Sequence, residues 1–111
     1  LPVAKTAGSL LLWSDEDLIE GVLWAMNIDH QTIRVIGFCI DKQVQRMGHG
    51  SRGWKQMGEI AKSSGRTVVY LEVKADNEVA IQFYRTHDLS PTGVLMTYYQ
   101  GNPGLVMSGD L

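Results

Sequence analysis

Short apolar runs separated by polar turns occupy the first third of the chain, a pattern typical of β-strands. Apolar residues gather at residues 9–13 and again at residues 21–28, and the stretch between them, residues 14–17, is acidic. We expect these two runs to be strands joined as a hairpin or meander. A third run, residues 32–40, follows a turn at residues 29–31 and is apolar on both alternating faces through its second half. That pattern predicts a central strand covered on both sides.

The middle of the chain changes to the longer repeat of an amphipathic helix. In residues 51–64 the apolar positions recur at helical spacing, and Gly65 stands where a helix C-cap is expected. Residues 67–74 return to two-residue alternation and predict a strand. A second helix is expected to begin at a cap provided by Asp76 and to run to Thr86.

Two further strands complete the pattern. They are expected at residues 93–99 and 105–108, on either side of a Gly-Asn-Pro-Gly turn at residues 101–104. The order of elements is therefore strands, helix, strand, helix, strands. That order, within 111 residues and without internal repeats, predicts a single α/β domain with a mixed sheet.

Composition and charge narrow the classes of partner. Hydrophobic residues make up 44% of the chain and charged residues 20%, which is an ordinary globular composition. The formal net charge is -2 and the lysines and arginines are scattered, so the sequence argues against a nucleic-acid partner. The longest apolar run falls far short of the about 20 residues of a membrane-spanning helix. We therefore expect no membrane partner either.

Cysteine use and the first residue bear on location and completeness. The single cysteine, Cys39, excludes an internal disulfide and cannot by itself form a metal site. We expect no metal and a reducing, cytoplasmic location. The sequence begins with Leu1 rather than methionine, and we expect its N-terminus to be incomplete.

A glycine-containing segment, Gln45-Arg46-Met47-Gly48-His49-Gly50-Ser51, links the third strand to the first helix. A helix N-terminus offers unpaired backbone N–H groups and the positive end of the helix dipole, so such a segment forms an anion site. By itself the segment fits a structural turn as well as a phosphate site. It is not a P-loop, because no Lys-Ser or Lys-Thr follows the last glycine, and it lacks the three-glycine dinucleotide fingerprint.

Two segments in this order resemble the GNAT superfamily of N-acetyltransferases. Gln45, Gly48 and Gly50 match the signature Gln/Arg-x-x-Gly-x-Gly/Ala, and residues 71–84 (LEVKADNEVAIQFY) are similar to the superfamily's strand-to-helix segment. Within the superfamily the sequence of residues 71–84 is similar to that of Rim-type ribosomal-protein and other Nα-terminal acetyltransferases. The resemblance implies the GNAT (acyl-CoA N-acyltransferase) fold, a mixed central sheet with flanking helices. It also implies acetyl transfer from acetyl-CoA to a primary amine, with a peptide N-terminus as the candidate acceptor.

The chain departs from the family pattern in three ways. Asp88 and Leu89 stand where Gly-Phe is usual after the second helix, and Gly53 and Gly58 occupy positions where bulky helix residues are usual. The first strand and two helices that form one wall of the family's acceptor cleft are expected to be missing or reduced. We expect a homodimer, because the apolar surface that those helices would cover needs another partner.

The resemblance assigns a catalytic pair. Glu72, on the polar face of its strand, resembles the carboxylate base of Rim-type enzymes, and Tyr84 resembles the acid that protonates the leaving thiolate. A peptide α-amino group with a pKa of about 8 needs only weak help from a base, and a phenol of pKa about 10 can protonate a thiolate. The alternatives stay open at this stage. Glu72 also fits an exposed residue facing solvent or pairing with Lys74, and Tyr84 also fits a core aromatic beside Phe83.

The resemblance also implies the contacts of cofactor and substrate. A backbone N–H near Ile40 would polarise the thioester carbonyl, and Asn77 would hold the pantetheine arm or orient water, or only cap its helix. Tyr98 and Tyr99 match tyrosines that help to bind a peptide backbone. The implied cofactor-binding residues are Phe38, Ile40, Gln45, Arg46, Met47, Gly48, His49, Gly50, Ser51, Asn77 and Tyr84.

Two other functions stay compatible with the sequence. One is a small-molecule amine acetyltransferase, and the other is a non-catalytic acyl-CoA-binding module. Tyr98 and Tyr99 favour the peptide acceptor, whereas the expected loss of one cleft wall keeps the small-molecule acceptor open.

Overall fold

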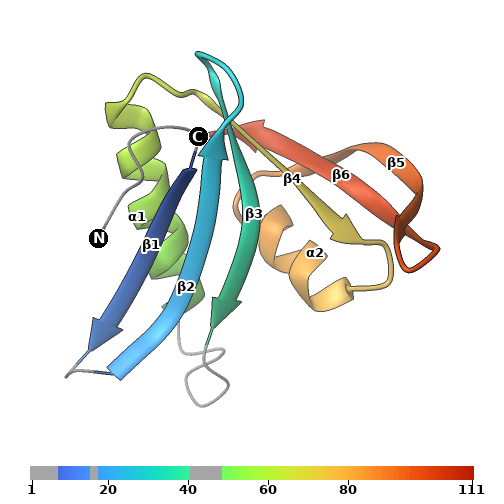
Figure 1. Cartoon of the computed structure of the whole chain (residues 1–111), viewed down its shortest axis with the longest axis horizontal. Helices are drawn as coiled ribbons and strands as arrows, with labels where there is room; N and C mark the ends of the chain where they lie inside the picture. The colour runs from blue at the N-terminus through green and yellow to red at the C-terminus, as the bar shows by residue number, and fades with distance from the viewer. Residues whose placement is uncertain (1–7, 16–17, 41–48) are drawn as a thin grey trace.

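The computed structural model describes residues 8–15, 18–40 and 49–111 (Figure 1). In chain order its elements are β1 (Gly8–Asp15), β2 (Leu18–Asn27), β3 (Thr32–Ile40), α1 (His49–Ser63), β4 (Val68–Lys74), α2 (Glu78–Thr86), β5 (Ser90–Tyr99) and β6 (Asn102–Asp110). The strands form one sheet in the order β1-β2-β3-β4-β6-β5, in which β3 and β4 are parallel and the other neighbouring pairs antiparallel. The predicted α/β fold with a mixed sheet is confirmed.

The first hairpin is tighter than the sequence predicts. Contrary to the turn expected over residues 14–17, β1 continues to Asp15 and β2 begins at Leu18. The reason is that the antiparallel ladder itself extends to the pair formed by these two residues. The acidic stretch is therefore partly strand.

The last hairpin also reverses earlier than predicted. β6 begins at Asn102, which pairs with Tyr99, so the turn consists of Gln100 and Gly101 rather than residues 101–104. Both turn residues have positive φ, 50° and 81°. Such a two-residue turn matches the right-handed twist of the strands it joins, which explains why β5 and β6 pair up to its edge.

The two helices begin at positions that differ slightly from those predicted. α1 starts at His49, two residues before the expected bound, so the end of the predicted phosphate-binding loop is the first turn of the helix. The cap of α2 is Asn77, whose side chain accepts a hydrogen bond of 3.2 Å from the Ala80 N–H. The prediction of Asp76 as the cap is wrong, because the side chain that bonds to the first turn of the helix is that of Asn77.

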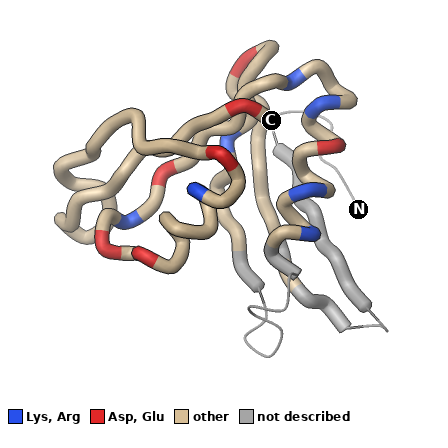
Figure 2. The backbone as a smooth tube through the Cα atoms, turned by 180° about the vertical axis from the view of Figure 1, so that it is seen from behind, with Lys and Arg blue, Asp and Glu red and all other residues tan. Residues whose placement is uncertain are grey.

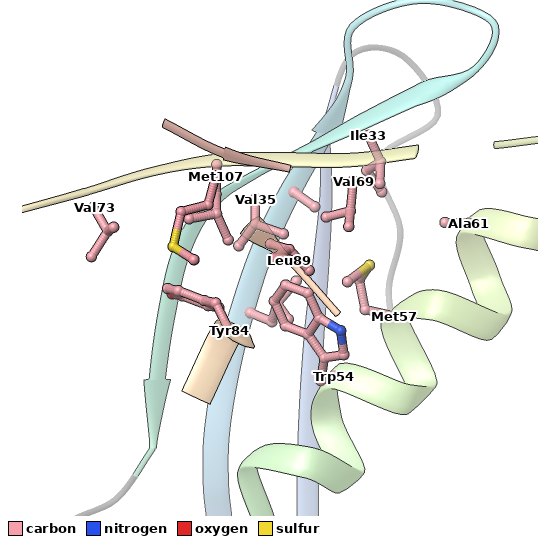
Figure 3. Close-up of a cluster of buried hydrophobic side chains, with 13 residues drawn as sticks. Ile33, Val35, Trp54, Met57, Ala61, Val69, Val73, Tyr84, Leu89 and Met107 are labelled. Atoms are coloured by element: carbon pink, nitrogen blue, oxygen red, sulfur yellow. The ribbon is translucent and has the colours of Figure 1, made fainter. Parts of the chain in front are cut away.

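Both helices contribute to one buried cluster on a single face of the sheet (Figure 3). The buried residues are Leu23, Ala25, Ile33, Val35, Trp54, Met57, Ala61, Val69, Leu71, Val73, Tyr84, Leu89 and Met107. We call the opposite face the helix-free face. Full burial of a leucine-sized side chain contributes about 1.5–3 kcal/mol, so this single layer supplies most of the driving force for folding.

The central strand β3 has the predicted bounds but is not covered on both sides. Ile33 and Val35 are buried under the helices, whereas Ile36 is 46% exposed. The prediction of a strand covered on both faces is therefore wrong within the described residues. The physical reason is that α1 and α2 pack on the same side.

β3 and β4 run side by side for only part of their length (Figure 1). Their paired register ends at Val35 and Leu71, although β3 continues to Ile40 and β4 to Lys74. The pairing of β3 with β2 shifts by one residue at the same level, with Ile36 as the extra residue. This β-bulge bends β3 at the point where the two parallel strands part.

Candidate active site

Glu72 lies on the helix-free face of β4, where three side chains hold it. Its carboxylate forms an ion pair with Arg34 of β3. The Tyr70 hydroxyl donates a long hydrogen bond of 3.4 Å to the other carboxylate oxygen, Oε2. The Glu72 main-chain carbonyl accepts a hydrogen bond of 3.3 Å from the Tyr98 hydroxyl. Burial alternates along β4, so the predicted orientation of Glu72 away from the apolar face is confirmed.

The partner of Glu72 is not the one that the sequence suggests. The side chain of Glu72 is 18% exposed and pairs with Arg34, so it neither faces open solvent nor pairs with Lys74. The Lys74 ammonium instead lies over the ring of Tyr99, 5.6 Å from its centroid. Alternation in β3 does place Arg34 on the polar face between Ile33 and Val35. The register of two parallel strands, which brings Arg34 beside Glu72, leaves no local signal in the sequence.

Tyr70 acts as a hydrogen-bond donor to this carboxylate. Removal from water raises the pKa of the Tyr70 hydroxyl above its usual value, and the negative charge of Glu72 raises the pKa further, while Arg34 lowers it. The hydroxyl therefore stays protonated around neutral pH and faces Glu72 as a donor.

Tyr98 reaches Glu72 across the intervening strand β6. The ring passes over Gly104, where an added Cβ would lie 2.6 Å from the Tyr98 Cγ. Only a glycine permits this approach. The predicted substrate residues Tyr98 and Tyr99 are 38% and 52% exposed, so both present surface to a ligand.

The predicted acid, Tyr84, lies on the other side of the sheet. It is 8% exposed within the buried cluster, with its ring centroid 5.6 Å from that of Trp54 and 5.7 Å from that of Phe83. Its surroundings thus match the core aromatic that the sequence left open. The role of Tyr84 as a proton donor stays a prediction.

An aromatic group joins the N-terminal half of α1, the end of α2 and the diverging part of β3. The ring of Phe38 lies 5.3 Å from Phe83 and 6.0 Å from Trp54. The His87 ring lies 4.6 Å from Phe83 and 5.6 Å from Trp54. Trp54 and Phe83 also contact the Tyr84 ring. The two predicted cofactor residues Phe38 and Tyr84 therefore belong to the same aromatic group.

His87 is a residue that sequence analysis missed. Its Nε2 lies 3.2 Å from the Ser51 Oγ in the first turn of α1. Partial burial lowers the pKa of His87 below its usual value, and the nearby Asp88 opposes that shift. No local pattern could have identified His87, because the contact depends on how α1 and α2 pack.

The structure describes only some of the remaining predicted cofactor residues. Gln45, Arg46, Met47 and Gly48 lie outside the described residues, as does the side chain of Ile40. His49, Gly50 and Ser51 form the first turn of α1, not a loop. Asn77 caps α2 from an exposed position, which leaves the predicted contact with a pantetheine arm untested.

The electrostatics of α1 suit an anion. Its first turn contains no acidic residue, and the helix carries Arg52, Lys55 and Lys62 against a single acid, Glu59 (Figure 2). The positive end of the helix dipole adds to this charge at the N-terminus. The described residues of α1 therefore fit a phosphate-bearing cofactor.

Over residues 8–15, 18–40 and 49–111, no group of three or more His, Cys, Asp or Glu side chains is arranged to hold a metal ion. Neither described helix is long and apolar enough to cross a membrane.

The sequence matches the family model described as the acetyltransferase (GNAT) family over residues 3–88. A comparison with curated proteins found no match. Among solved structures, Ard1 from Thermoplasma volcanium is similar with a TM-score of 0.81 and 26% identity, over 84% of this chain and 64% of that one. The chain thus spans less than two thirds of the length of that relative.

Two other similar structures show the same fold at lower identity. The ribosomal-protein-S18-alanine N-acetyltransferase from Escherichia coli has a TM-score of 0.84 and 17% identity, over 94% of this chain and 69% of that one. A GNAT family acetyltransferase from Elizabethkingia anophelis, crystallised with acetyl-CoA bound, has a TM-score of 0.86 and 14% identity. The alignment covers 95% of this chain and 77% of that structure.

Proposed function

The chain belongs to the acetyltransferase (GNAT) family, and on that premise we propose that it transfers an acetyl group from acetyl-CoA to the primary amine of an acceptor. The observation that carries the proposal is the parting of β3 and β4 after Val35 and Leu71 with Glu72 beside it. At that point the parted strands β3 and β4 present backbone N–H groups, and the carboxylate of Glu72 lies beside them. In acyl transfer to an amine, backbone N–H groups stabilise the developing oxyanion and a carboxylate assists as a base.

Acetyl-CoA supplies an activated thioester when it is bound. The residues proposed to hold it are the N-terminus of α1 with Ser51 for the diphosphate, and Asn77 and Tyr84 of the α2 region for the pantetheine arm. The basic charge of α1 supports this assignment. So do the acetyl-CoA and CoA bound in crystals of the Elizabethkingia anophelis and Bacillus subtilis relatives.

Glu72 is proposed as the base that accepts the amine proton, directly or through water. Arg34 occupies Oε1, so Oε2 is the atom left to face an acceptor. Tyr70 donates only weakly to Oε2 at 3.4 Å and does not block it. On the opposite side of the sheet, Tyr84 is proposed to return a proton to the departing thiolate.

A peptide N-terminus is the acceptor that the surroundings of Glu72 favour. The Tyr98 hydroxyl contacts the main chain of Glu72, and both Tyr98 and Tyr99 are exposed enough to contact a peptide backbone. Because Arg34 neutralises the Glu72 carboxylate, that carboxylate offers little net attraction to polycationic acceptors such as polyamines and aminoglycosides. Ard1 and the ribosomal-protein-S18-alanine enzyme are among the structures that share the fold.

The test is acetyl-CoA turnover with a panel of peptides, polyamines and aminoglycosides. We expect turnover with peptides, and a fall in kcat of about 10²–10⁴-fold in Glu72→Gln if the carboxylate is the base. Tyr84→Phe should lower kcat without changing the KM of the acceptor. Glu78→Gln, an exposed glutamate in the first turn of α2, is the matched control and should behave as wild type.

A non-catalytic acyl-CoA-binding module is the second candidate. It is favoured by the pairing of Glu72 with Arg34 and by the burial of Tyr84. This candidate predicts CoA binding without turnover of any amine. The same acceptor panel, combined with calorimetric titration of CoA, separates the two functions.

We also propose that the protein is a homodimer in the cytoplasm. The support for the dimer is the exposed apolar surface on the helix-free face, where Trp24 is 52% exposed beside Ile36. The single Cys39 supports a reducing compartment.

A further inference from the structure

One side-chain contact joins the start of α1 to the end of α2. Ser51 lies in the first turn of α1, and His87 is the C-cap residue of α2, 36 positions along the chain. The Ser51 Oγ and the His87 Nε2 are 3.2 Å apart, within hydrogen-bond distance. The contact therefore places an imidazole at the helix terminus proposed to hold the diphosphate.

The His87 ring is held by its own surroundings. It packs 4.6 Å from the Phe83 ring and 5.6 Å from the Trp54 ring, centroid to centroid. Its main-chain N–H donates to the Tyr84 carbonyl at 3.0 Å. The direction of Nε2 toward Ser51 is thus set by packing and by the helix end, rather than by the hydrogen bond alone.

The protonation of the imidazole decides what Ser51 can do. Burial lowers the pKa of His87, so the ring is mostly neutral around pH 7 and carries one N–H. If that proton is on Nε2, the imidazole donates to the Ser51 Oγ, and the hydroxyl keeps its own proton for another acceptor. If the proton is on Nδ1, the hydroxyl donates to His87 and turns its lone pairs toward an incoming anion. Only the first arrangement supports an anion at this terminus.

We propose that His87 is a positioning residue of the cofactor site, which donates from Nε2 to the Ser51 Oγ so that the Ser51 hydroxyl donates to a diphosphate oxygen of CoA. This inference rests on the proposed function. It gives the aromatic group between α1 and α2 a second role besides packing, because Phe83 and Trp54 fix the donor that orients Ser51. Two aligned donors in sequence also polarise each other, which strengthens both hydrogen bonds.

The experiment is calorimetric titration with CoA of five proteins, which are the wild type, His87→Phe, His87→Gln, Ser51→Ala and the double variant Ser51→Ala/His87→Phe. His87→Phe keeps an aromatic ring but removes the donor, whereas His87→Gln keeps a side-chain N–H that can reach Ser51. We expect His87→Phe to weaken CoA binding roughly 3- to 10-fold, the usual effect of one neutral hydrogen bond, and His87→Gln to restore most of the loss. In the Ser51→Ala background His87→Phe should have no further effect.

The controls separate this inference from the proposed function. His30→Phe makes the same substitution at an exposed turn position and should leave CoA affinity unchanged. A wild-type protein that binds no CoA overturns the cofactor site and the inference together. Wild-type binding with equal losses from His87→Phe in both backgrounds, or with no loss at all, leaves the proposed function standing and overturns the role of His87.

Discussion

At the scale of single residues, the ion pair of Glu72 with Arg34 is both a support and a restraint. A carboxylate with one oxygen held has a defined direction for the other, which helps a base that must meet an amine at one angle. The same ion pair also restrains the base, because the positive charge of Arg34 competes with the amine proton for the Glu72 carboxylate. Because Glu72 is only 18% exposed, loss of Arg34 also leaves a mostly buried carboxylate without its cation.

Replacement of Arg34 therefore tests the positioning of the base. We expect Arg34→Gln to lower kcat for a peptide acceptor roughly 10-fold through lost orientation, with the KM for acetyl-CoA unchanged. Arg34→Lys, which retains the positive charge but not the planar fork, should recover part of the loss. Steady-state kinetics of both variants measures this. A wild-type kcat in Arg34→Gln would contradict a positioning role for Arg34.

A second residue-scale feature is the left-handed conformation of Asp88 at the end of α2. Its φ is 68°, and its N–H and that of Leu89 donate to the carbonyls of Arg85 and Tyr84. These bonds define a Schellman motif, whose left-handed position usually holds glycine. The family's Gly-Phe is thus replaced by residues that keep the geometry, and Leu89 is only 2% exposed in the core.

Asp88→Gly should therefore stabilise the protein. Relief of the left-handed strain is expected to raise the free energy of unfolding by roughly 1 kcal/mol, which shifts Tm by about 4–8 °C in a domain of this size. Asp88→Ala keeps a Cβ in the same conformation and is the matched control, with little gain. Thermal unfolding followed by circular dichroism measures both. Equal Tm values for the glycine and alanine variants would contradict the explanation.

At the scale of elements, the β5–β6 hairpin carries a side chain to a strand that it does not neighbour. Tyr98 of β5 crosses β6 above Gly104 and reaches the main chain of β4 at Glu72. The pairing of β5 with β6 is irregular between Leu95 and Tyr99, which frees Tyr98 from the regular ladder. The hairpin therefore acts as a brace for the strand that bears the proposed base.

Gly104→Ala tests this brace. The added Cβ would overlap the Tyr98 ring, so we expect a loss of about 1–3 kcal/mol in the free energy of unfolding, as for other overpacked sites. The KM for a peptide acceptor should rise while the affinity for CoA stays unchanged. Gly93→Ala in the same hairpin is the stability control, because its Cβ would make only an ordinary van der Waals contact, 3.5 Å from Val106. A Gly104→Ala variant with wild-type stability and acceptor KM would contradict the brace.

The elements also show where sequence analysis succeeds. Every strand and helix was predictable, because alternation in β4 and helical spacing in α1 depend only on neighbouring positions. Glu72 and Tyr98 were assigned through the family resemblance. The ion pair with Arg34 and the contact of Ser51 with His87 were not predictable, because each depends on the register or packing of distant elements. The same reason applies to the exposed side of β3, since no local pattern tells on which face a helix will pack.

At the scale of the whole molecule, all described helix packing lies on one face of the sheet and leaves the other face open. Trp24 and Ile36 present apolar surface there, next to the polar group around Arg34 and Glu72. An apolar patch beside a charged site is typical of an interface with a polar rim. A partner copy on this patch would bring its own residues close to the acceptor side of the site.

The dimer is therefore expected to depend on the patch and to affect acceptor binding. Light scattering on the purified protein should give twice the monomer mass, and Trp24→Ser should shift the population toward monomer. Val79→Ser removes an even more exposed apolar residue from α2, on the opposite side, and should leave the mass unchanged. A wild-type mass of about 12.3 kDa would contradict the dimer.

The parting of β3 and β4 has a consequence for how the molecule opens. Strand pairing between the meander β1-β2-β3 and the group β4-β6-β5 is limited to four residue pairs, from Thr32 with Val68 to Val35 with Leu71. Each half is an antiparallel unit with a ladder of its own, so the halves are natural units of subglobal unfolding. Amide protons of the paired residues of β3 and β4 would then exchange with solvent when the two halves separate. A molecule bound between the ends of these two strands would oppose the separation and slow that exchange.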